Sequence, residues 1–208
     1  MEEWMDISLI INESTLPFPG DDSLKVDWVK SFAKDGYNLS VLSLNMHIGT
    51  HIDYKKHVLD VEDNISFNQF MGKANVLFLE PRDNIIRTID IIHAFQYIEN
   101  KENILIISVN HEDKLNQKDY FEYPKFEKSI YKFLINNGIK LLGADLPSFE
   151  YSKGDMLDMH KDLLSKDIYL IENLCHLNRL RSHIDFMAIP LPIEGVEASM
   201  VRALAKNL

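Results

Sequence analysis

The chain has 208 residues, of which 46% are hydrophobic and 26% charged, a composition typical of a globular domain with a sizeable core. Its formal net charge of −10 argues against a general nucleic-acid binder, which needs a basic surface. Neither a glycine-rich phosphate loop nor a dinucleotide fingerprint occurs in the sequence. We expect one domain over residues 1–208, with no interdomain linker.

Several sequence features favour a cytoplasmic protein. No run of about 18 uncharged apolar residues is present, which argues against a transmembrane helix. The segment that starts at Met1 is acidic and lacks the basic and apolar regions of a signal peptide. Cys175, the one cysteine, has no partner for an internal disulfide and is expected to be a small buried residue. We therefore expect a protein that binds neither a membrane nor nucleic acid.

The first half of the chain is rich in predicted strands. Residues 5–10 form a short first strand, and prolines with Gly20 then mark a rigid turn. Residues 24–32 and 37–46 both alternate in apolar character, which predicts a β-hairpin. Its second strand leads to His47, and functional groups commonly follow such strands on loops braced by a sheet.

The second half alternates apolar runs with helical patterns. We expect strands at 73–79, 103–109, 139–144, 168–171 and 183–192, and helices at 88–99, 124–137 and 155–165. A short helical turn is expected at 66–71, and a polar surface loop that contains His111 at 110–123. Such alternation after a strand-rich start predicts an α/β fold.

Residues 47–57 gather side chains that hold protons or metals. His47, His51 and Asp53 offer two imidazoles and a carboxylate, a set that suits zinc or manganese. Residues four apart on a straight strand are separated by roughly 13 Å, so shared ligation requires a bend. Gly49 permits the backbone angles of such a bend. His47 alone would more often be a buried, hydrogen-bonded histidine, but its neighbours favour a metal site.

This stretch resembles the signature of the cyclase family of metal-dependent hydrolases, which includes bacterial kynurenine formamidase and isatin hydrolase. The family pattern His-x-Gly-Thr-His-x-Asp-x-Pro-x-His is matched at His47, Gly49, Thr50, His51, Asp53 and His57. Lys55 stands where the family has proline. Further similar segments are Gly-x-Asp-x-Pro-Ser at 143–148, Glu-Asn-Leu at 172–174 and Met-Val-Arg-Ala at 200–203, so the resemblance covers nearly the whole chain.

The resemblance implies a fold, a ligand set and an assembly. The fold would be a central mixed β-sheet flanked by helices, of the swivelling β/β/α kind. His160 and Glu172 align with the distal metal ligands and would join His47, His51 and Asp53 around one or two ions of Zn²⁺ or Mn²⁺. Family members are usually homodimers or higher oligomers, sometimes with a neighbour completing the active-site wall.

Roles for the remaining residues of the site are hypotheses at this level. His57 would exchange protons with water and the leaving nitrogen, although a sixth-ligand or loop role stays open. Phe18 would wall the pocket by resemblance, or only pack on its loop. Tyr54 would narrow the pocket, and Lys55 would attract an anionic substrate. Asp145 would either orient a ligand histidine or cap its loop.

We expect hydrolysis of a small amide by metal-activated water. By resemblance the activity is arylformamidase, which converts N-formylkynurenine to kynurenine and formate in tryptophan breakdown. Ser108 and Val109 stand where relatives that act on formylkynurenine tend to carry Arg-Thr. Hydrolysis of a cyclic amide such as isatin therefore remains an alternative, as does a metal-containing ligand-binding module without turnover.

Overall fold

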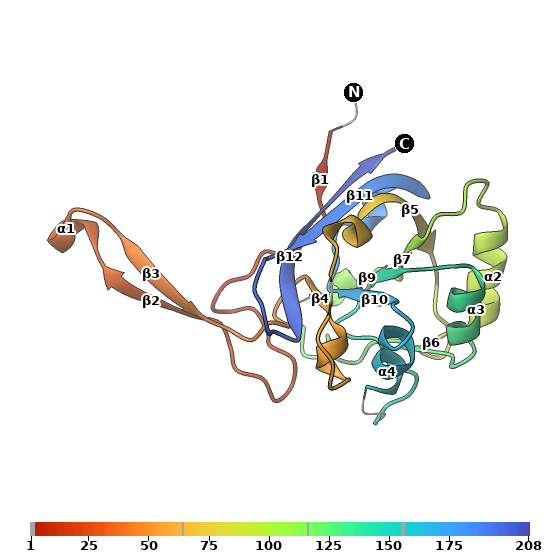
Figure 1. The fold of residues 1–208 in the computed structure, drawn as a ribbon, viewed down its shortest axis with the longest axis horizontal. Coiled ribbons are helices and arrows are strands. Elements are labelled where there is room, and N and C mark those ends of the chain that lie inside the picture. Colours follow the sequence, from red (N-terminus) through yellow and green to blue (C-terminus); the bar gives the residue numbers. More distant parts are fainter. Residues whose placement is uncertain (1–2, 64, 116, 155–156) are drawn as a thin grey trace.

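The centre of the protein is an eight-stranded mixed sheet. The computed structural model describes residues 3–63, 65–115, 117–154 and 157–208. The strand order is β1-β12-β11-β5-β7-β9-β10-β4, and β4 also pairs with β12, so the sheet closes into a ring (Figure 1). The strands are β1 Met5–Asp6, β4 His51–Asp53, β5 Met71–Phe78, β7 Ile104–Ser108, β9 Leu141–Ala144, β10 Tyr169–Glu172, β11 His183–Pro190 and β12 Ala198–Asn207. The predicted α/β class with a mixed sheet is confirmed.

The strands β5, β7, β9 and β10 run parallel, and helices connect them. These helices are α2 Thr88–Gln96, α3 Ile130–Asn136 and α4 Asp158–Leu164, and they gather on one side of the sheet (Figure 1). Short 3₁₀ helices occur at η1 Lys55–His57, η2 Phe67–Phe70, η3 His111–Lys114 and η4 Leu177–Arg179. Two short strands, β6 Ile85–Ile86 and β8 Lys125–Phe126, form a separate parallel pair.

The parallel strands are continuous apolar runs because both of their faces are buried. Side chains alternate along β7, so Ile104 and Ile106 join one apolar cluster while Leu105 and Ile107 join another. The first cluster lies within the ring of strands, and the second lies between the sheet and helices α2, α3 and α4. The sheet is therefore a rigid base for the loops at its edge.

Two of the predicted elements require correction. The helix expected over 124–137 begins only at Ile130, because Lys125 and Phe126 instead pair with β6 as β8. The segment 110–123 is not a wholly exposed loop. Its His111 is 4% exposed and is hydrogen-bonded through Nε2 to the carbonyl of Tyr120. For the helix predicted at 155–165, residues 155 and 156 lie outside the described part of the chain, and α4 begins at Asp158.

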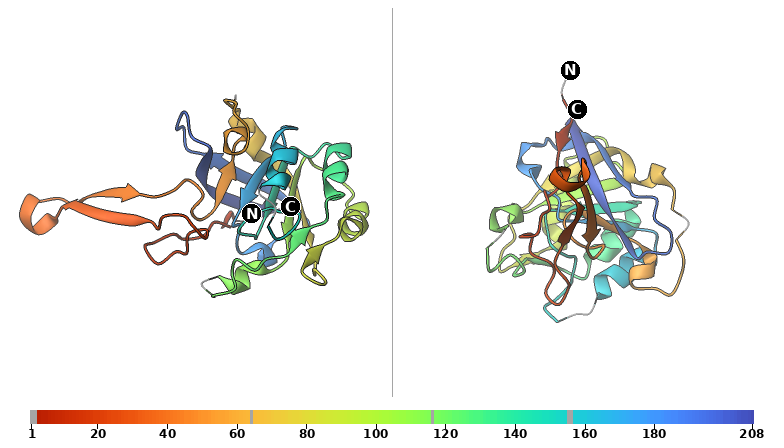
Figure 2. Two further views of the ribbon diagram at one scale, coloured as in Figure 1. Left: turned by 90° about the horizontal axis from the view of Figure 1, so that it is seen from below. Right: turned by 90° about the vertical axis from the view of Figure 1, so that its left-hand side faces the viewer.

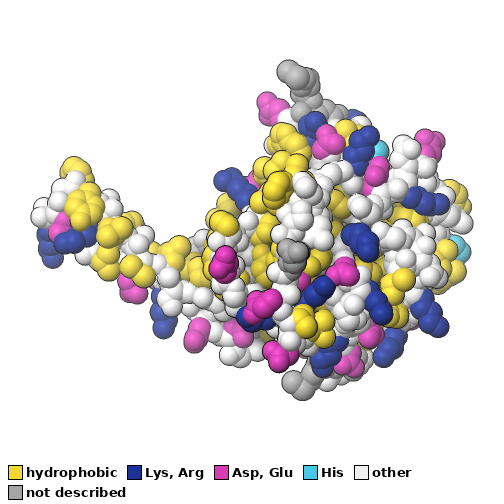
Figure 3. Space-filling view, viewed as in Figure 1, with side chains coloured by type: hydrophobic (Ala, Val, Ile, Leu, Met, Phe, Trp, Pro, Cys, Tyr) yellow, Lys and Arg dark blue, Asp and Glu magenta, His cyan; other side chains and the backbone are white. Residues whose placement is uncertain are grey.

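The predicted β-hairpin is present and projects from the body as an arm (Figures 1 and 2). It consists of β2 Lys25–Lys30 and β3 Leu39–Ser43, joined through α1 Phe32–Asp35, and is a two-stranded sheet of its own. Its apolar side chains lie in solvent: Trp28 is 66% exposed and Phe32 72% exposed. Figure 3 shows apolar side chains along the arm.

Across the described ranges of the chain, the helices all lack the length and apolar character that crossing a bilayer requires.

Candidate metal centre

A bend at Gly49 brings the first group of ligand candidates together. Gly49 has φ of +67°, and the chain enters β4 directly afterwards. His47 Nδ1 consequently lies 3.2 Å from His51 Nε2, although a straight strand would hold these residues far apart. Asp53 Oδ1 lies 3.0 Å from His47 Nδ1 and 3.3 Å from His51 Nε2. The predicted bend is confirmed.

The second group comes from the opposite end of the chain. β10 pairs antiparallel with β4, and its register sets Glu172 directly opposite His51. His160 on α4 completes the group, with Nε2 3.0 Å from Glu172 Oε1 and 3.3 Å from Asp53 Oδ2. Glu172 Oε2 lies 3.3 Å from His51 Nε2. All five residues predicted as ligands therefore meet at one point of the sheet.

The separations between these atoms fit a divalent metal. Two ligand atoms, each about 2.0–2.1 Å from a tetrahedral zinc, are roughly 3.3–3.4 Å apart. The observed separations of 3.0–3.3 Å are close to that value. Both oxygens of Asp53 are buried and make no hydrogen bond to the described residues, which suits carboxylate oxygens that ligate a cation. Two triads that share Asp53 can each hold an ion: His47 with His51, and His160 with Glu172.

Electrostatics agree with a cation site. Burial opposes the charge on His51, but the carboxylates of Asp53 and Glu172 outweigh it and raise the pKa of His51 to about 10. Burial also opposes the charge on His160, yet the same carboxylates and Glu150 hold its pKa well above the usual value. Protons and a metal cation would therefore compete for these ring nitrogens.

His57 lies beside these residues. Its ring centroid is 4.3 Å from that of His47 and 5.6 Å from that of His160. Burial is the main reason why the pKa of His57 falls below its usual 6.5. The neutral imidazole therefore predominates at neutral pH, and this is the form that accepts a proton.

A further layer of contacts orients the imidazoles. His51 Nδ1 donates to the carbonyl of Gly49 at 2.9 Å, which turns Nε2 toward the site. His160 Nδ1 lies 3.3 Å from Glu150 Oε1, and His47 Nε2 lies 3.6 Å from Glu197 Oε1. Such partners fix the orientation and basicity of ligand histidines. Glu150 and Glu197 were not predicted from the sequence. Glu150 lies five positions after Asp145, so its nearness to the family segment at 143–148 was the one available signal.

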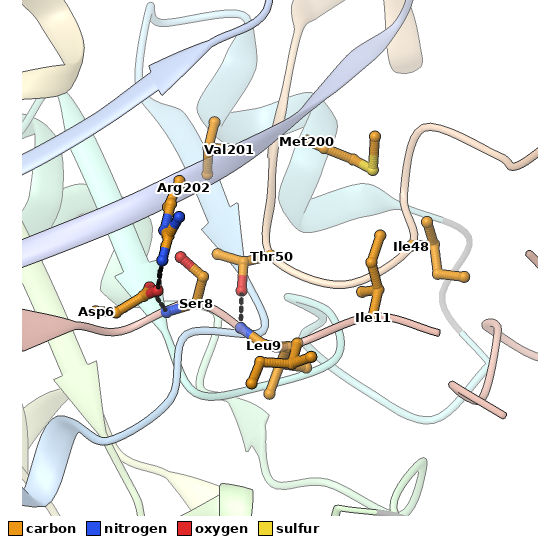
Figure 4. A pocket seen from close by; sticks show the side chains of 10 residues that line it. Asp6, Ser8, Leu9, Ile11, Ile48, Thr50, Met200, Val201 and Arg202 are labelled. Atoms are coloured by element: carbon orange, nitrogen blue, oxygen red, sulfur yellow. Dashed lines mark hydrogen bonds and ion pairs between the residues drawn. The ribbon is translucent and has the colours of Figure 1, made fainter. Parts of the chain in front are cut away.

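Thr50 of the motif ties three segments together behind the site. Its hydroxyl accepts a hydrogen bond from the Leu9 amide at 2.8 Å (Figure 4). The same hydroxyl donates to the Asn173 carbonyl at 2.6 Å. The Asn173 side chain in turn donates to the Gly49 carbonyl at 3.1 Å. Asp145 accepts hydrogen bonds from the amides of Val109 and His111, so it caps the loop that follows the neighbouring strand β7, whereas the prediction was a cap on its own loop.

The site forms one end of a cavity of about 600 Å³. Phe18 lines it and meets Phe121 edge-on at 5.5 Å between centroids. Tyr54 is not among the lining residues. It follows Asp53, and alternation along β4 directs its side chain to the opposite face, into the apolar cluster within the ring. Lys55 pairs with Asp167, so the structure does not place its charge in the cavity.

The family profile described as "Putative cyclase" matches residues 5–151. The chain belongs to the cyclase family. The matched span ends before His160 and Glu172, which the fold nevertheless brings to the motif residues.

Similar proteins match along nearly their whole length. A kynurenine formamidase of Bacillus thuringiensis subsp. konkukian is 27% identical over 99% of this cyclase-family chain and 98% of its own, and one of Bacillus cereus gives the same values. Isatin hydrolase A from Ralstonia solanacearum superposes with a TM-score of 0.85 at 17% identity, over 99% of this chain and 92% of that chain. A predicted metal-dependent hydrolase from Bacillus stearothermophilus gives 0.82 at 20%, over 99% and 98%. These structural likenesses establish the shared fold.

Proposed function

We propose that residues 1–208 form one domain that hydrolyses a small amide with a divalent metal, as an arylformamidase. One observation carries the proposal: candidate ligand atoms of five residues converge at separations of 3.0–3.3 Å beside the imidazole of His57. Relatives of full length that are named kynurenine formamidase support N-formylkynurenine as the substrate, with kynurenine and formate as products. The free, buried Cys175 supports a reducing, cytoplasmic setting. The kynurenine formamidase relatives support a role in tryptophan breakdown.

We assign His47, His51, Asp53, His160 and Glu172 as the ligands. Imidazole and carboxylate suit Zn²⁺ or Mn²⁺, and the two triads that share Asp53 support two ions. When bound, such an ion lowers the pKa of water to roughly 7 and polarises a carbonyl group. The chain's contribution is to orient these imidazoles and to bury the carboxylates away from bulk water.

We assign proton transfer to His57. Its neutral imidazole would accept the proton of the attacking water and return it to the leaving nitrogen, which cannot depart as an anion. Its position over His47 and His160 supports this role, because a group there faces the cavity that would hold the amide. Phe18 and Phe121 would pack against the aryl ring of the substrate.

The test measures metal content per chain and formate release from N-formylkynurenine in one preparation. We expect bound metal, chelator-sensitive turnover, and a loss of about 10²–10⁴-fold in kcat for His57→Ala with its metal retained. His93→Ala, which changes an exposed histidine on α2, is the matched control and should leave turnover unchanged. Full activity in the His57 variant would remove its role, and absence of metal after zinc or manganese supplementation would refute the metal site.

We also propose that the chain forms a homodimer through the arm. A two-stranded hairpin with exposed aromatic residues is marginal on its own, which supports a protein partner for it. A groove of about 340 Å³ has Ile10, Ile48 and Met200 in its lining. Figure 4 shows Ile48 and Met200 there. Ile10 is 90% exposed. Because one chain carries both surfaces, a two-fold axis would let each arm fill the groove of the other copy.

Light scattering on the full chain tests this assembly. We expect a dimer for the wild type and a monomer for Trp28→Asp with Phe32→Asp. Tyr97→Asp, which alters an exposed aromatic residue next to α2, is the control and should remain dimeric. A monomeric wild type would overturn the proposal.

A further inference from the structure

Lys125 occupies an unusual position in the cavity of the metal centre. It lies on β8, where Phe126 turns into the core and alternation directs Lys125 toward the opposite side. The backbone there is anchored, because the Lys125 amide donates to Asn84 at 3.0 Å and the Phe126 amide donates to the Glu150 carbonyl at 2.8 Å. Lys125 lines the same cavity as His57 and the candidate ligands.

The ammonium group of Lys125 has an aromatic partner and, among the described residues, no carboxylate partner. Its Nζ lies 3.1 Å from the centroid of the Tyr123 ring. Lys153, the other cavity lysine in the described part of the chain, is 81% exposed and pairs with Glu122 at 3.0 Å. No carboxylate of a described residue lies within the 4.0 Å ion-pair distance of Lys125 Nζ, whereas Lys153 is already neutralised.

The half-buried setting makes this charge costly to leave without an anion. Burial is the main cause that lowers the pKa of Lys125 to about 8, while the more distant Glu150, Glu122 and Glu172 raise it and Lys153 lowers it. The amine is therefore still mostly charged at pH 7. A structural role on Tyr123 alone would be served by an uncharged side chain of the same length.

We propose that Lys125 is a specificity-determining residue that binds a carboxylate carried by the substrate. The aryl ring would lie against Phe18 and Phe121, and the scissile amide would face His57 and the ligand cluster. The substrate class is then an aryl formamide whose side chain carries a carboxylate, and lactams without a carboxylate are disfavoured. This inference rests on the proposed hydrolase function. It pairs the ammonium group of Lys125 with the carboxylate of the substrate.

The test compares N-formylkynurenine with its methyl ester, which keeps the aryl formamide and removes the carboxylate. In the metal-loaded wild type we expect a lower KM for the acid than for the ester. Lys125→Met should raise KM for the acid by about 10–100-fold, the loss of one charge-assisted hydrogen bond, and leave kcat within a few-fold. It should leave KM for the ester unchanged. Lys125→Arg should recover part of the loss, and Lys153→Met should behave as the wild type.

The outcomes separate this inference from the function on which it rests. Equal effects of Lys125→Met on acid and ester would overturn the role of Lys125 while the hydrolase function stands. Failure to turn over either compound would refute the arylformamidase function. Calorimetric binding of kynurenine to the metal-loaded protein then decides for Lys125: weaker binding in Lys125→Met supports the carboxylate site, and unchanged binding overturns it. Melting temperatures of all variants check that each is folded.

Discussion

Substitution of Gly49 by alanine tests whether the bend between His47 and His51 requires a residue without a side chain. An added Cβ would overlap Cγ2 of Ile11, and φ at this position is +67°. The left-handed conformation costs a residue with a Cβ about 1–2 kcal/mol, and forcing a methyl group into a packed site costs typically 1–3 kcal/mol. We expect a total near 3 kcal/mol, which for a chain of this size lowers Tm by about 6–12 °C.

A double-mutant cycle separates the two causes. Ile11→Ala removes the methyl group that Cβ would meet, so Gly49→Ala combined with Ile11→Ala should recover the overlap part and keep the left-handed part. The assays are thermal unfolding and zinc competition with a chromophoric chelator, each on metal-free protein. Zinc affinity should follow the same order as stability, because the bend sets the distance between His47 and His51. Strictly additive effects of the two substitutions would refute the steric explanation.

Three further outcomes follow from the site. Glu150→Gln should weaken zinc binding by about 10–100-fold in a competition assay, because the carboxylate beside His160 Nδ1 is lost. Glu62→Gln, which changes a surface ion pair with Lys56, is the control and should leave zinc affinity unchanged. Zinc binding at pH 7 should release protons, because the pKa values of His51 and His160 are raised. The release appears in calorimetry as a binding heat that depends on the ionisation enthalpy of the buffer. A heat that does not depend on the buffer would contradict the raised pKa values. The folded-state pKa of His51 is raised from 6.5 to about 10, so its contribution to the stability of the metal-free protein is complete below pH 6.5 and is lost as pH rises through 10. Unfolding of the metal-free protein should therefore become easier between pH 7 and 9, and an unchanged Tm across that range would contradict this sign.

Much of the site is predictable because its first part is local. His47, His51 and Asp53 lie within seven positions, and Gly49 supplies the one backbone angle that their approach requires. The buried strands are equally readable, because continuous apolar runs such as Ile104–Ser108 have few other uses in a chain of this composition.

The remaining features depend on contacts between distant segments. The family resemblance is what identifies His160 and Glu172 as candidate ligands. The residues around Glu172 in the sequence do not indicate that it lies opposite His51 in a pair of strands. The helix predicted from residue 124 was shortened by pairing of Lys125 with Ile85, a contact 40 positions away. The bulk of Tyr54, in a segment where relatives carry small residues, predicts a narrower pocket. The side chain instead joins the apolar cluster within the ring, because adjacent residues of a strand point to opposite faces.

The ring of strands also sets an order for folding. β4 pairs with β10 and with β12, and the partner residues of Asp53 are Leu170 and Ala198. These contacts span most of the chain, and contacts of high sequence separation form slowly because a long loop must close before they form. A ribosome-bound chain that ends before β10 can present the motif histidines but cannot hold them against Glu172. Assembly of the candidate metal centre therefore has to wait until β10 has emerged and paired with β4.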